Sequence, residues 1–420
     1  MNESYALYTG IDWAAYEHQV CVIDPDGQMI EERKFAHSHE GLAQMADRLC
    51  ALAGEDAGRV AVAIEVPRGA VVETLLERGL AVFSINPKQL DRFRDRHTVA
   101  GAKDDRRDAF VLADSLRTDM PLYRKARLDD AGTIRLRELS RMDDALRESG
   151  MRESSRLREQ LTRYWPQLLN LCSAADEPWM WALLQRAPAP QAARRLTRAG
   201  VASVLKAHRI RRLSPAEVLA AWKTPPLHVA PGTIEAASHH VGILVEQLQL
   251  LHKQRTACQR NISALLHELT DSGEDGTGQM EKHRDAKIIL SMPGIGTLVA
   301  ATMLAQAGQA LAERDYQALR VHTGVAPVTK QSGTRRHVVM RRACDRCLRN
   351  CVYHWARISV QHDPRSRKMY QALRSKGHGH GRALRSVADR LLKILVVMLQ
   401  TGTLYDPGHQ SRVSPGVRAA

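Results

Sequence analysis

The predicted secondary structure changes near residue 130 from alternating strands and helices to helices alone. This change limits the possible folds more than any other feature. Before it, short runs of alternating or continuous apolar residues predict strands, and the stretches between them have helical spacing. A strand ribbon followed by a strand–helix–strand–helix series is typical of an α/β domain. From about residue 134 the strand signals stop and helical spacing takes over. We therefore expect an α/β N-terminal domain and a mainly α-helical remainder.

The elements expected in the first part are short, whereas two of the later ones are long. The predicted strands are 8–13, 19–23, 29–35, 60–65 and 81–85, and the predicted helices are 41–52, 71–77 and 105–116. Farther on, the charged helical stretches 134–164 and 234–269 favour either an antiparallel pair or an intermolecular coiled coil. A proline-rich segment lies between these two stretches, and a linker is expected at 272–276.

The length of 420 residues is enough for two or three domains. We expect an α/β domain at 1–124, a helical, coiled-coil and linker region at 125–285, a mainly α-helical C-terminal domain at 286–400, and a disordered tail at 401–420. No apolar run approaches the ~18 residues that span a bilayer, and the first residues lack the pattern of a signal peptide. We therefore expect a cytoplasmic protein without membrane contact.

The positive charge of the chain is concentrated near its C-terminus. The net charge is +15, and residues 321–400 contain 17 Lys and Arg against three Asp, an excess of +14. Such a block attracts phosphate backbones, although a merely solvated basic surface is the alternative. Aromatic residues make up 5% of the chain, so backbone and shape contacts are expected to outweigh base stacking.

Four acidic residues of the first part form a candidate metal site. Asp12 lies in the middle of the first predicted strand, and Glu65 ends another. Asp105 and Asp108 share one face of a predicted helix, with Asp104 as a competitor for Asp105. Carboxylates at one end of a sheet can hold Mg²⁺ for phosphoryl transfer. Each acid has a plain structural alternative, such as a helix-start or solvated carboxylate.

The C-terminal part offers two candidate phosphate contacts. The turn that contains Gly294 and Gly296 precedes a predicted helix, whose free N–H groups suit a phosphate, although a plain helix–helix turn fits nearly as well. Ser332 stands in a polar stretch, followed shortly by Arg335 and Arg336. From spacing alone, this serine is a phosphate-contacting residue that could, if activated, act as a nucleophile.

The seven cysteines are expected to be free thiols, because their number is odd and a disulfide framework does not suit a long cytoplasmic chain. Cys344, Cys347 and Cys351 have a spacing that suggests zinc, but on a helix the same spacing is one apolar face. We expect them to be core residues. The glycine–histidine run at 377–381 is expected to be a flexible loop near phosphate rather than a metal site.

The ordered motifs resemble those of a known family over nearly the whole chain. They are Ile11-Asp12-Trp13, Glu65, 103–109, 292–296, 324–327, Gln331-Ser332-Gly333 and a stretch from Arg382 to Tyr405-Asp406. Together these motifs resemble the DEDD/serine transposases of bacterial insertion sequences, which are bridge-RNA-guided recombinases. This resemblance implies an RNase H-like N-terminal domain similar to the junction resolvase RuvC, with metal ligands at Asp12, Glu65, Asp105 and Asp108.

The same resemblance implies that Ser332 forms a covalent phosphoserine link to DNA. It also implies donor and target DNA as substrates, a structured noncoding guide RNA, and a homo-oligomer, either a dimer or a tetramer, assembled through the central helices. Two alternatives are a metal-dependent junction nuclease without a covalent intermediate and a non-catalytic nucleic-acid-binding protein.

Overall fold

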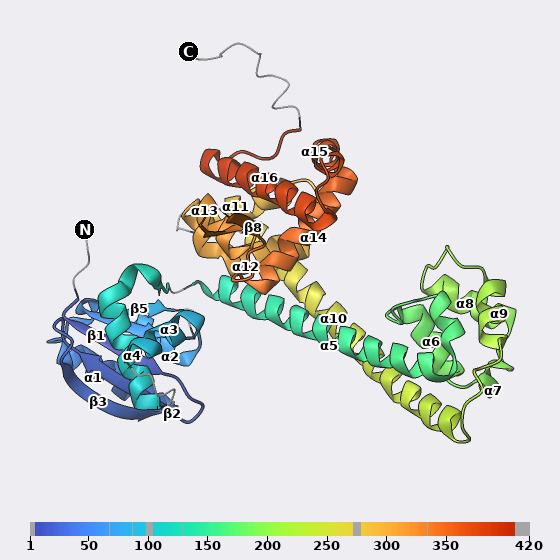
Figure 1. The fold of residues 1–420 in the computed structure, drawn as a ribbon, viewed down its shortest axis with the longest axis horizontal. Helices are drawn as coiled ribbons and strands as arrows, with labels where there is room; N and C mark the ends of the chain where they lie inside the picture. The colour runs from blue at the N-terminus through green and yellow to red at the C-terminus, as the bar shows by residue number, and fades with distance from the viewer. Residues whose placement is uncertain are drawn as a thin grey trace, which may run out of the picture. The chain divides into compact units, whose positions relative to one another are not determined.

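The computed structural model describes residues 5–66, 68–85, 87–97, 104–127, 129–271, 279–333 and 335–407. The chain divides into two compact units, Met1–Asp130 and Ala131–Ala420 (Figure 1). The expected linker at 272–276 and most of the expected C-terminal tail fall outside these ranges.

The N-terminal unit contains a six-stranded sheet in the order β3-β2-β1-β4-β5-β6. The first three strands form an antiparallel ribbon, while β4 is parallel to both β1 and β5. The short β6 pairs antiparallel with β5. The strands are β1 (Leu7–Asp12), β2 (Glu17–Ile23), β3 (Met29–Ala36), β4 (Val60–Ile64), β5 (Ala81–Ser84) and β6 (Arg124–Lys125). The predicted α/β pattern and its five strands are confirmed, with small changes at their ends.

Helices cover both faces of this sheet. α1 (His39–Leu52) and α2 (Ala70–Glu77) pack against one face, and α3 (Pro87–His97) and α4 (Asp105–Asp119) against the other. Alternate residues of β4 belong to the two cores, which explains why this strand is apolar at every position. Three of these helices were predicted, and α3 was not.

Two long helices run antiparallel in the second unit, α5 (Ala131–Tyr164) and α10 (Thr233–Asp271), and they lie side by side (Figure 1). Asp143 of α5 accepts hydrogen bonds from Arg255 and Gln259 of α10. Nearer the start of α5, the carbonyl of Leu139 lies 3.3 Å from Sγ of Cys258. Of the two predicted arrangements, an antiparallel pair and an intermolecular coiled coil, the structure therefore has the antiparallel pair within a single chain.

The proline-rich segment between these helices is a small helical bundle. It contains η3 (Pro166–Asn170), α6 (Pro178–Arg186), α7 (Pro190–Ala193), α8 (Arg198–Ala207) and α9 (Pro215–Lys223). Four of these five elements begin with proline, which suits the first helical position because the missing N–H would have no partner there. Trp165, Trp179 and Trp222 pack together in the core of the bundle.

The last part of the second unit combines six helices with a two-stranded ribbon. The helices share one core and are α11 (Gln279–Ser291), α12 (Thr297–Ala312), α13 (Tyr316–His322), α14 (Arg346–His362), α15 (Pro364–Ser375) and α16 (His380–Thr401). The ribbon consists of β7 (Val328–Ser332) and β8 (Arg335–Val339). The prediction that strands end before residue 134 was therefore wrong here. Nearly all residues of the ribbon are exposed, so neither face produces an apolar alternation.

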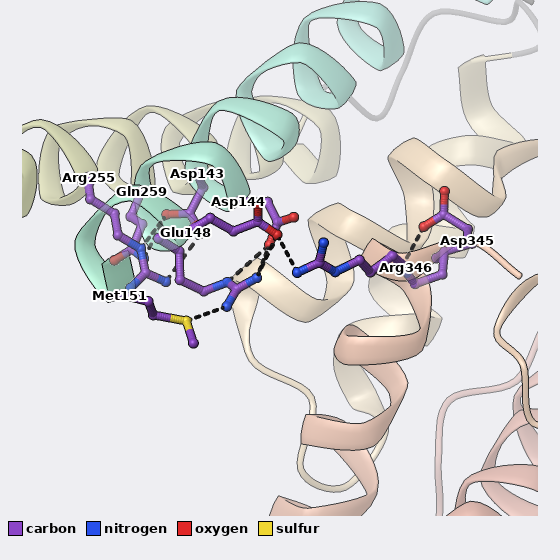
Figure 2. A network of polar contacts seen from close by, with 10 residues as sticks. Asp143, Asp144, Glu148, Met151, Arg255, Gln259, Asp345 and Arg346 are labelled. Atoms are coloured by element: carbon purple, nitrogen blue, oxygen red, sulfur yellow. Dashed lines mark hydrogen bonds and ion pairs between the residues drawn. The ribbon is translucent and has the colours of Figure 1, made fainter. Parts of the chain in front are cut away.

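A polar network ties the long helices to the C-terminal helices (Figure 2). Glu148 of α5 forms an ion pair of 2.7 Å with Arg346 at the start of α14. On the same helix, Arg147 pairs with Asp144 at 2.6 Å. Arg346 is largely exposed, and an exposed pair of this kind contributes at most about 1 kcal/mol. The buried apolar residues of α14, rather than this network, therefore provide most of its packing.

Candidate active site

Two carboxylates leave the N-terminal sheet at the same edge. Ile11 of β1 lies opposite Ile64 of the parallel strand β4, so the next residues, Asp12 and Glu65, emerge side by side. Asp12 is the last residue of β1, and Trp13 already belongs to the turn. The prediction of a charge in the middle of the strand was therefore wrong. At the strand end Asp12 is only half-buried, which makes its charge far less costly.

A glycine allows α4 to lie directly against β1. A Cβ placed on Gly10 would lie 1.9 Å from the carbonyl oxygen of Ala109 and 2.6 Å from the backbone nitrogen of Ala113. No side chain fits in that space, so only glycine permits this helix–strand contact. The first turns of α4, which contain Asp105 and Asp108, are thereby held against the strand that ends in Asp12.

Asp108 is the most buried of the four predicted acids, with an exposed fraction of 2%. Arg94 of α3 binds both of its oxygens, with Nε–Oδ1 at 2.6 Å and Nη2–Oδ2 at 2.8 Å. Partial burial acts to lower the pKa of Arg94, but hydrogen bonding to Asp108 and the charges of Asp108, Asp91 and Glu65 raise it overall. The guanidinium of Arg94 therefore offsets part of the negative charge at this end of the sheet, chiefly that of Asp108.

The acids at the start of α4 have different surroundings. The Asp104 carboxylate accepts a hydrogen bond of 3.2 Å from the backbone nitrogen of Arg106, so Asp104 is the N-cap of the helix. Asp105 is the first helical residue and is exposed. The capping bond engages the side chain of Asp104, which favours Asp105 over its neighbour as a metal ligand.

The four predicted acids do not form a closed cluster in the part of the chain that the structure describes. No three of them place oxygen atoms within 4.8 Å of one another there. The group that meets this criterion is Cys172, Asp176 and Glu177 in the helical bundle. Its Glu177 is paired with Arg212 at 2.6 Å and accepts a hydrogen bond from Trp179, so these residues hold the bundle together.

Ser332 lies at the tip of the β7–β8 ribbon. It ends β7 and pairs with Arg335, while Gln331 pairs with Arg336. Gly333 follows with φ = +55°, a left-handed conformation that a glycine adopts without strain. Ser332, Arg335 and Arg336 are all exposed. The structure therefore brings together the serine and the two arginines that the sequence singled out.

The turn at Gly294 is a packing feature of the C-terminal core. A Cβ on Gly294 would lie 2.6 Å from the backbone nitrogen of Ser359 in α14. The carbonyl of Pro293 accepts hydrogen bonds from Trp355 and Ser359 at 2.9 Å and 2.7 Å. Gly296 is the exposed N-cap of α12 and faces open space. The close approach of α14 thus explains why residue 294 is a glycine. Of the two glycines, Gly296 is the one with room for a phosphate beside it.

The basic block forms an exposed surface. None of the 17 Lys and Arg between 321 and 400 is buried, and most are exposed. Among the residues that the structure describes, only Arg346 in this set has an ion pair with a carboxylate, namely Glu148. Charges that no internal carboxylate offsets keep their attraction for phosphate, which agrees with the predicted nucleic-acid surface.

Of the three C-terminal cysteines predicted to be core residues, Cys351 is buried, whereas Cys344 and Cys347 are half-buried. Cys351 is buried and its thiol lies 3.5 Å from the carbonyl oxygen of Val299. Burial raises the pKa of Cys351, and it raises the pKa of Cys347 to about 11, so both are neutral thiols at pH 7. Cys344 precedes α14, so the three do not share one helical face as predicted.

The histidines of the 377–381 run also have defined surroundings. His380 begins α16, and its Nδ1 lies 2.7 Å from the hydroxyl of Tyr370. The carbonyl of His378 accepts a hydrogen bond from Arg374. This run therefore consists of a short connection after α15 and the first residues of α16, and the predicted role near phosphate stays a prediction.

Sequence reasoning missed two residues that shape the carboxylate site. Arg94 belongs to a helix that was not predicted, and nothing in its charged surroundings marks it as a partner of Asp108. Gly10 could have been recognised, because a glycine inside a strand commonly marks close approach of another backbone.

Comparison with known families agrees with the ordered motifs. Residues 9–166 match a transposase model of the DEDD type named for the insertion sequence IS110. Residues 286–371 match a second model, described as transposase of the IS116/IS110/IS902 family. The two matched ranges contain the four predicted acids and Ser332, respectively. The chain belongs to the IS110 family of insertion-sequence transposases. It is thus a DNA-processing enzyme, and the non-catalytic alternative is set aside.

Relatives of this IS110-family transposase support the assignment. A putative transposase, y4uE, from Sinorhizobium fredii is 49% identical over 213 residues, which cover 50% of this chain and 59% of the relative. The mini-circle putative transposase for IS117 from Streptomyces coelicolor is 29% identical over 427 residues, 100% of this chain and 99% of the relative. An uncharacterized protein of the insertion element IS900 from Mycobacterium paratuberculosis is 28% identical over 96% of this chain and 97% of its own length.

Within the described ranges of this transposase, no helix is both long and apolar enough to cross a membrane.

Proposed function

We propose that this transposase cuts and rejoins donor and target DNA through a covalent phosphoserine at Ser332. The observation that carries the proposal is the pairing of Ser332 with Arg335 across the β7–β8 ribbon. Directly paired residues on antiparallel strands point to the same face, with Cβ atoms about 5 Å apart. We therefore expect the guanidinium of Arg335 to bind the phosphate that Ser332 attacks.

In the proposed step, Oγ of Ser332 forms a bond to phosphorus, and the bond from phosphorus to one sugar oxygen breaks. The serine hydroxyl loses a proton and the departing sugar oxygen gains one, so protons and electrons balance. One phosphodiester replaces another, and the bond energy is conserved. Attack of a different sugar hydroxyl on the phosphoserine then rejoins the strands without ATP.

The carboxylate end of the N-terminal sheet fits Mg²⁺ by the chemistry of its donors. Asp12, Glu65 and Asp108 supply hard oxygen ligands, and exposed Asp105 can add a fourth. Arg94 binds both oxygens of Asp108, so Mg²⁺ at this carboxylate would take the place of a cationic partner that is already there. When bound, Mg²⁺ would supply charge stabilisation for phosphoryl transfer. The protein's own part is to hold the acids at one sheet edge through the register of β1 and β4.

Three finer features belong to the same proposal. A RuvC-like, RNase H-like fold is supported by the ribbon followed by parallel strands, with acids at their carboxyl ends. A structured guide RNA is supported by the exposed basic surface, which offers contacts to phosphates rather than a code for bases. Assembly into a dimer or tetramer through α5 and α10 stays a prediction, as do the domain limits at 124, 285 and 400.

Variants at two hydroxyls of the β7–β8 ribbon test the proposal. Ser332→Ala removes one oxygen from an exposed position, so folding and DNA binding should survive while strand exchange is lost. Thr329→Ala, a matched change at an exposed residue of the same strand, should retain exchange. Both are compared with wild type on labelled junction DNA in denaturing gels. If Ser332→Ala still cleaves at the wild-type rate, a junction nuclease that uses metal-activated water replaces the proposal.

A further inference from the structure

One tryptophan of this chain differs from all the others in its surroundings. Five of the six tryptophans are at most 5% exposed and lie in helical cores, whereas Trp13 is 45% exposed. Trp13 directly follows Asp12, the acid that ends β1. Exposing a large aromatic ring to water is costly, so an isolated tryptophan beside a reaction centre suggests a contact made by the substrate.

Tyr16 lies in the same turn, between β1 and β2, and is 87% exposed. The two rings are separated only by Ala14 and Ala15, both small and exposed. The turn therefore presents two aromatic rings with little bulk between them, at the edge of the sheet where Asp12 and Glu65 emerge.

Hydrogen bonds hold this turn in place. The backbone N–H of Ala14 donates to Nδ1 of His18 at 3.4 Å, and the backbone N–H of His37 donates to the carbonyl of Tyr16 at 2.7 Å. Because Nδ1 of His18 accepts, its Nε2 carries the proton and donates to Nδ1 of His37 at 2.9 Å. A turn fixed at both ends loses little conformational entropy when a ligand contacts its side chains.

We propose that Trp13 and Tyr16 form an aromatic platform that stacks on unpaired bases of the DNA strand beside the carboxylate site. The location rests on the proposed function of Asp12 and its neighbours. Strand exchange requires bases next to the reacting phosphate to leave their pairs, and aromatic rings bind any exposed base face. The platform holds the opened strand so that its phosphate stays near the acids. Trp13 and Tyr16 are thus positioning residues.

Binding of full-length protein to two DNA probes tests the platform. One probe is a duplex with a central unpaired bubble, the other the fully paired duplex, and a chelator prevents cleavage. Trp13→Ala should weaken bubble binding about tenfold and leave duplex binding nearly unchanged. Tyr16→Ala should have a smaller effect in the same direction. Trp13→Phe keeps a ring and should retain most of the affinity. Met29→Ala, an equally exposed apolar residue of the same sheet, is the control.

Quenching of tryptophan emission by the bubble probe adds a readout that reports contact with Trp13 directly. The bubble probe should quench part of the wild-type emission, and that part should be absent in Trp13→Phe, since the five other tryptophans are buried. Equal losses of affinity for bubble and duplex in Trp13→Ala, or none for either, would overturn the platform. So would a loss confined to single-stranded RNA of the same sequence, or a loss of self-association with DNA binding intact.

The aromatic platform and the proposed phosphoserine mechanism can be refuted separately. If Trp13→Ala binds the bubble normally while Ser332→Ala abolishes exchange, only the platform is wrong. If Asp12→Ala and Ser332→Ala both leave cleavage intact, the proposed chemistry is wrong whatever the bubble probe shows.

Discussion

The carboxylate end of the N-terminal sheet and the serine ribbon of the C-terminal unit differ most in what holds their side chains. Asp108 is buried, bound through both of its oxygens by the guanidinium of Arg94, and placed by a helix packed onto Gly10. Ser332 is exposed at the tip of a ribbon with almost no buried residue. The fold thus prearranges the surroundings of Asp108 at the carboxylate end, whereas Ser332 lies among exposed residues of its ribbon.

The largest effect on activity is expected at the carboxylate end of the N-terminal sheet. Asp12→Ala should reduce strand cleavage by about three orders of magnitude, because losing a ligand weakens binding of the cation that stabilises the transferred phosphate. The fold should persist, since Asp12 ends its strand and is only half-buried. Cleavage rates of the purified protein measure the effect, and Asp26→Ala, an exposed acid in the next turn, is the control. A wild-type rate in Asp12→Ala would refute the metal-site assignment.

The second-largest effect, on stability, is expected at the ion pair between Arg94 and Asp108. Arg94→Gln leaves Asp108 buried without its charged partner, which should destabilise the N-terminal unit by about 3 kcal/mol. Thermal unfolding without divalent cations measures this loss. Added Mg²⁺ should raise the melting temperature of Arg94→Gln more than that of wild type, because the cation takes over neutralisation of Asp108. The control is Arg92→Gln, an exposed arginine of the same helix. Unchanged stability of Arg94→Gln would mean that the pair does not hold the site.

A smaller effect is expected at the serine ribbon. Replacing both Arg335 and Arg336 by Ala should weaken binding to all DNA and RNA sequences alike, and should flatten the slope of log affinity against log salt by ~1 to 2 units. Both arginines are exposed, so the fold should not change. Binding titrations at several salt concentrations measure the slope. Loss of affinity at one base position with an unchanged slope would assign these arginines to base recognition instead.

The smallest effect is a dependence on pH in the turn after β1. Burial, and next the neighbouring His37, lower the pKa of His18 from its usual 6.5. The folded protein therefore binds this proton less readily than the unfolded chain, so His18 favours folding above about pH 6.5, and stability falls as the pH drops through its lowered pKa. Melting temperatures between pH 7.5 and pH 5 should fall less in His18→Gln than in wild type. An identical decline would exclude His18 as the cause.

Much of the N-terminal unit could be predicted from sequence because its strands are buried. Apolar residues at every position of 60–64 reflect a strand covered on both faces. The ribbon at 328–339 could not be predicted, because exposed strands carry no apolar pattern. The helical bundle in the proline-rich stretch between the long helices was not predicted, because prolines there begin helices rather than interrupt them.

The candidate site was predicted in its residue types but not in its contacts. Spacing identified Asp105 and Asp108 as a pair, yet only the structure separates exposed Asp105 from the capping residue Asp104. The bond between Arg94 and Asp108 joins two consecutive helices, and no apolar periodicity encodes it.

The most direct test of the account is the mass of the protein–DNA adduct. Wild-type protein is incubated with labelled substrate, denatured and digested, and DNA-linked peptides are analysed by mass spectrometry. The account predicts a single linked peptide whose modified residue is Ser332, and none in Ser332→Ala. Normal cleavage without any linked peptide, or linkage at another residue, would contradict the phosphoserine mechanism.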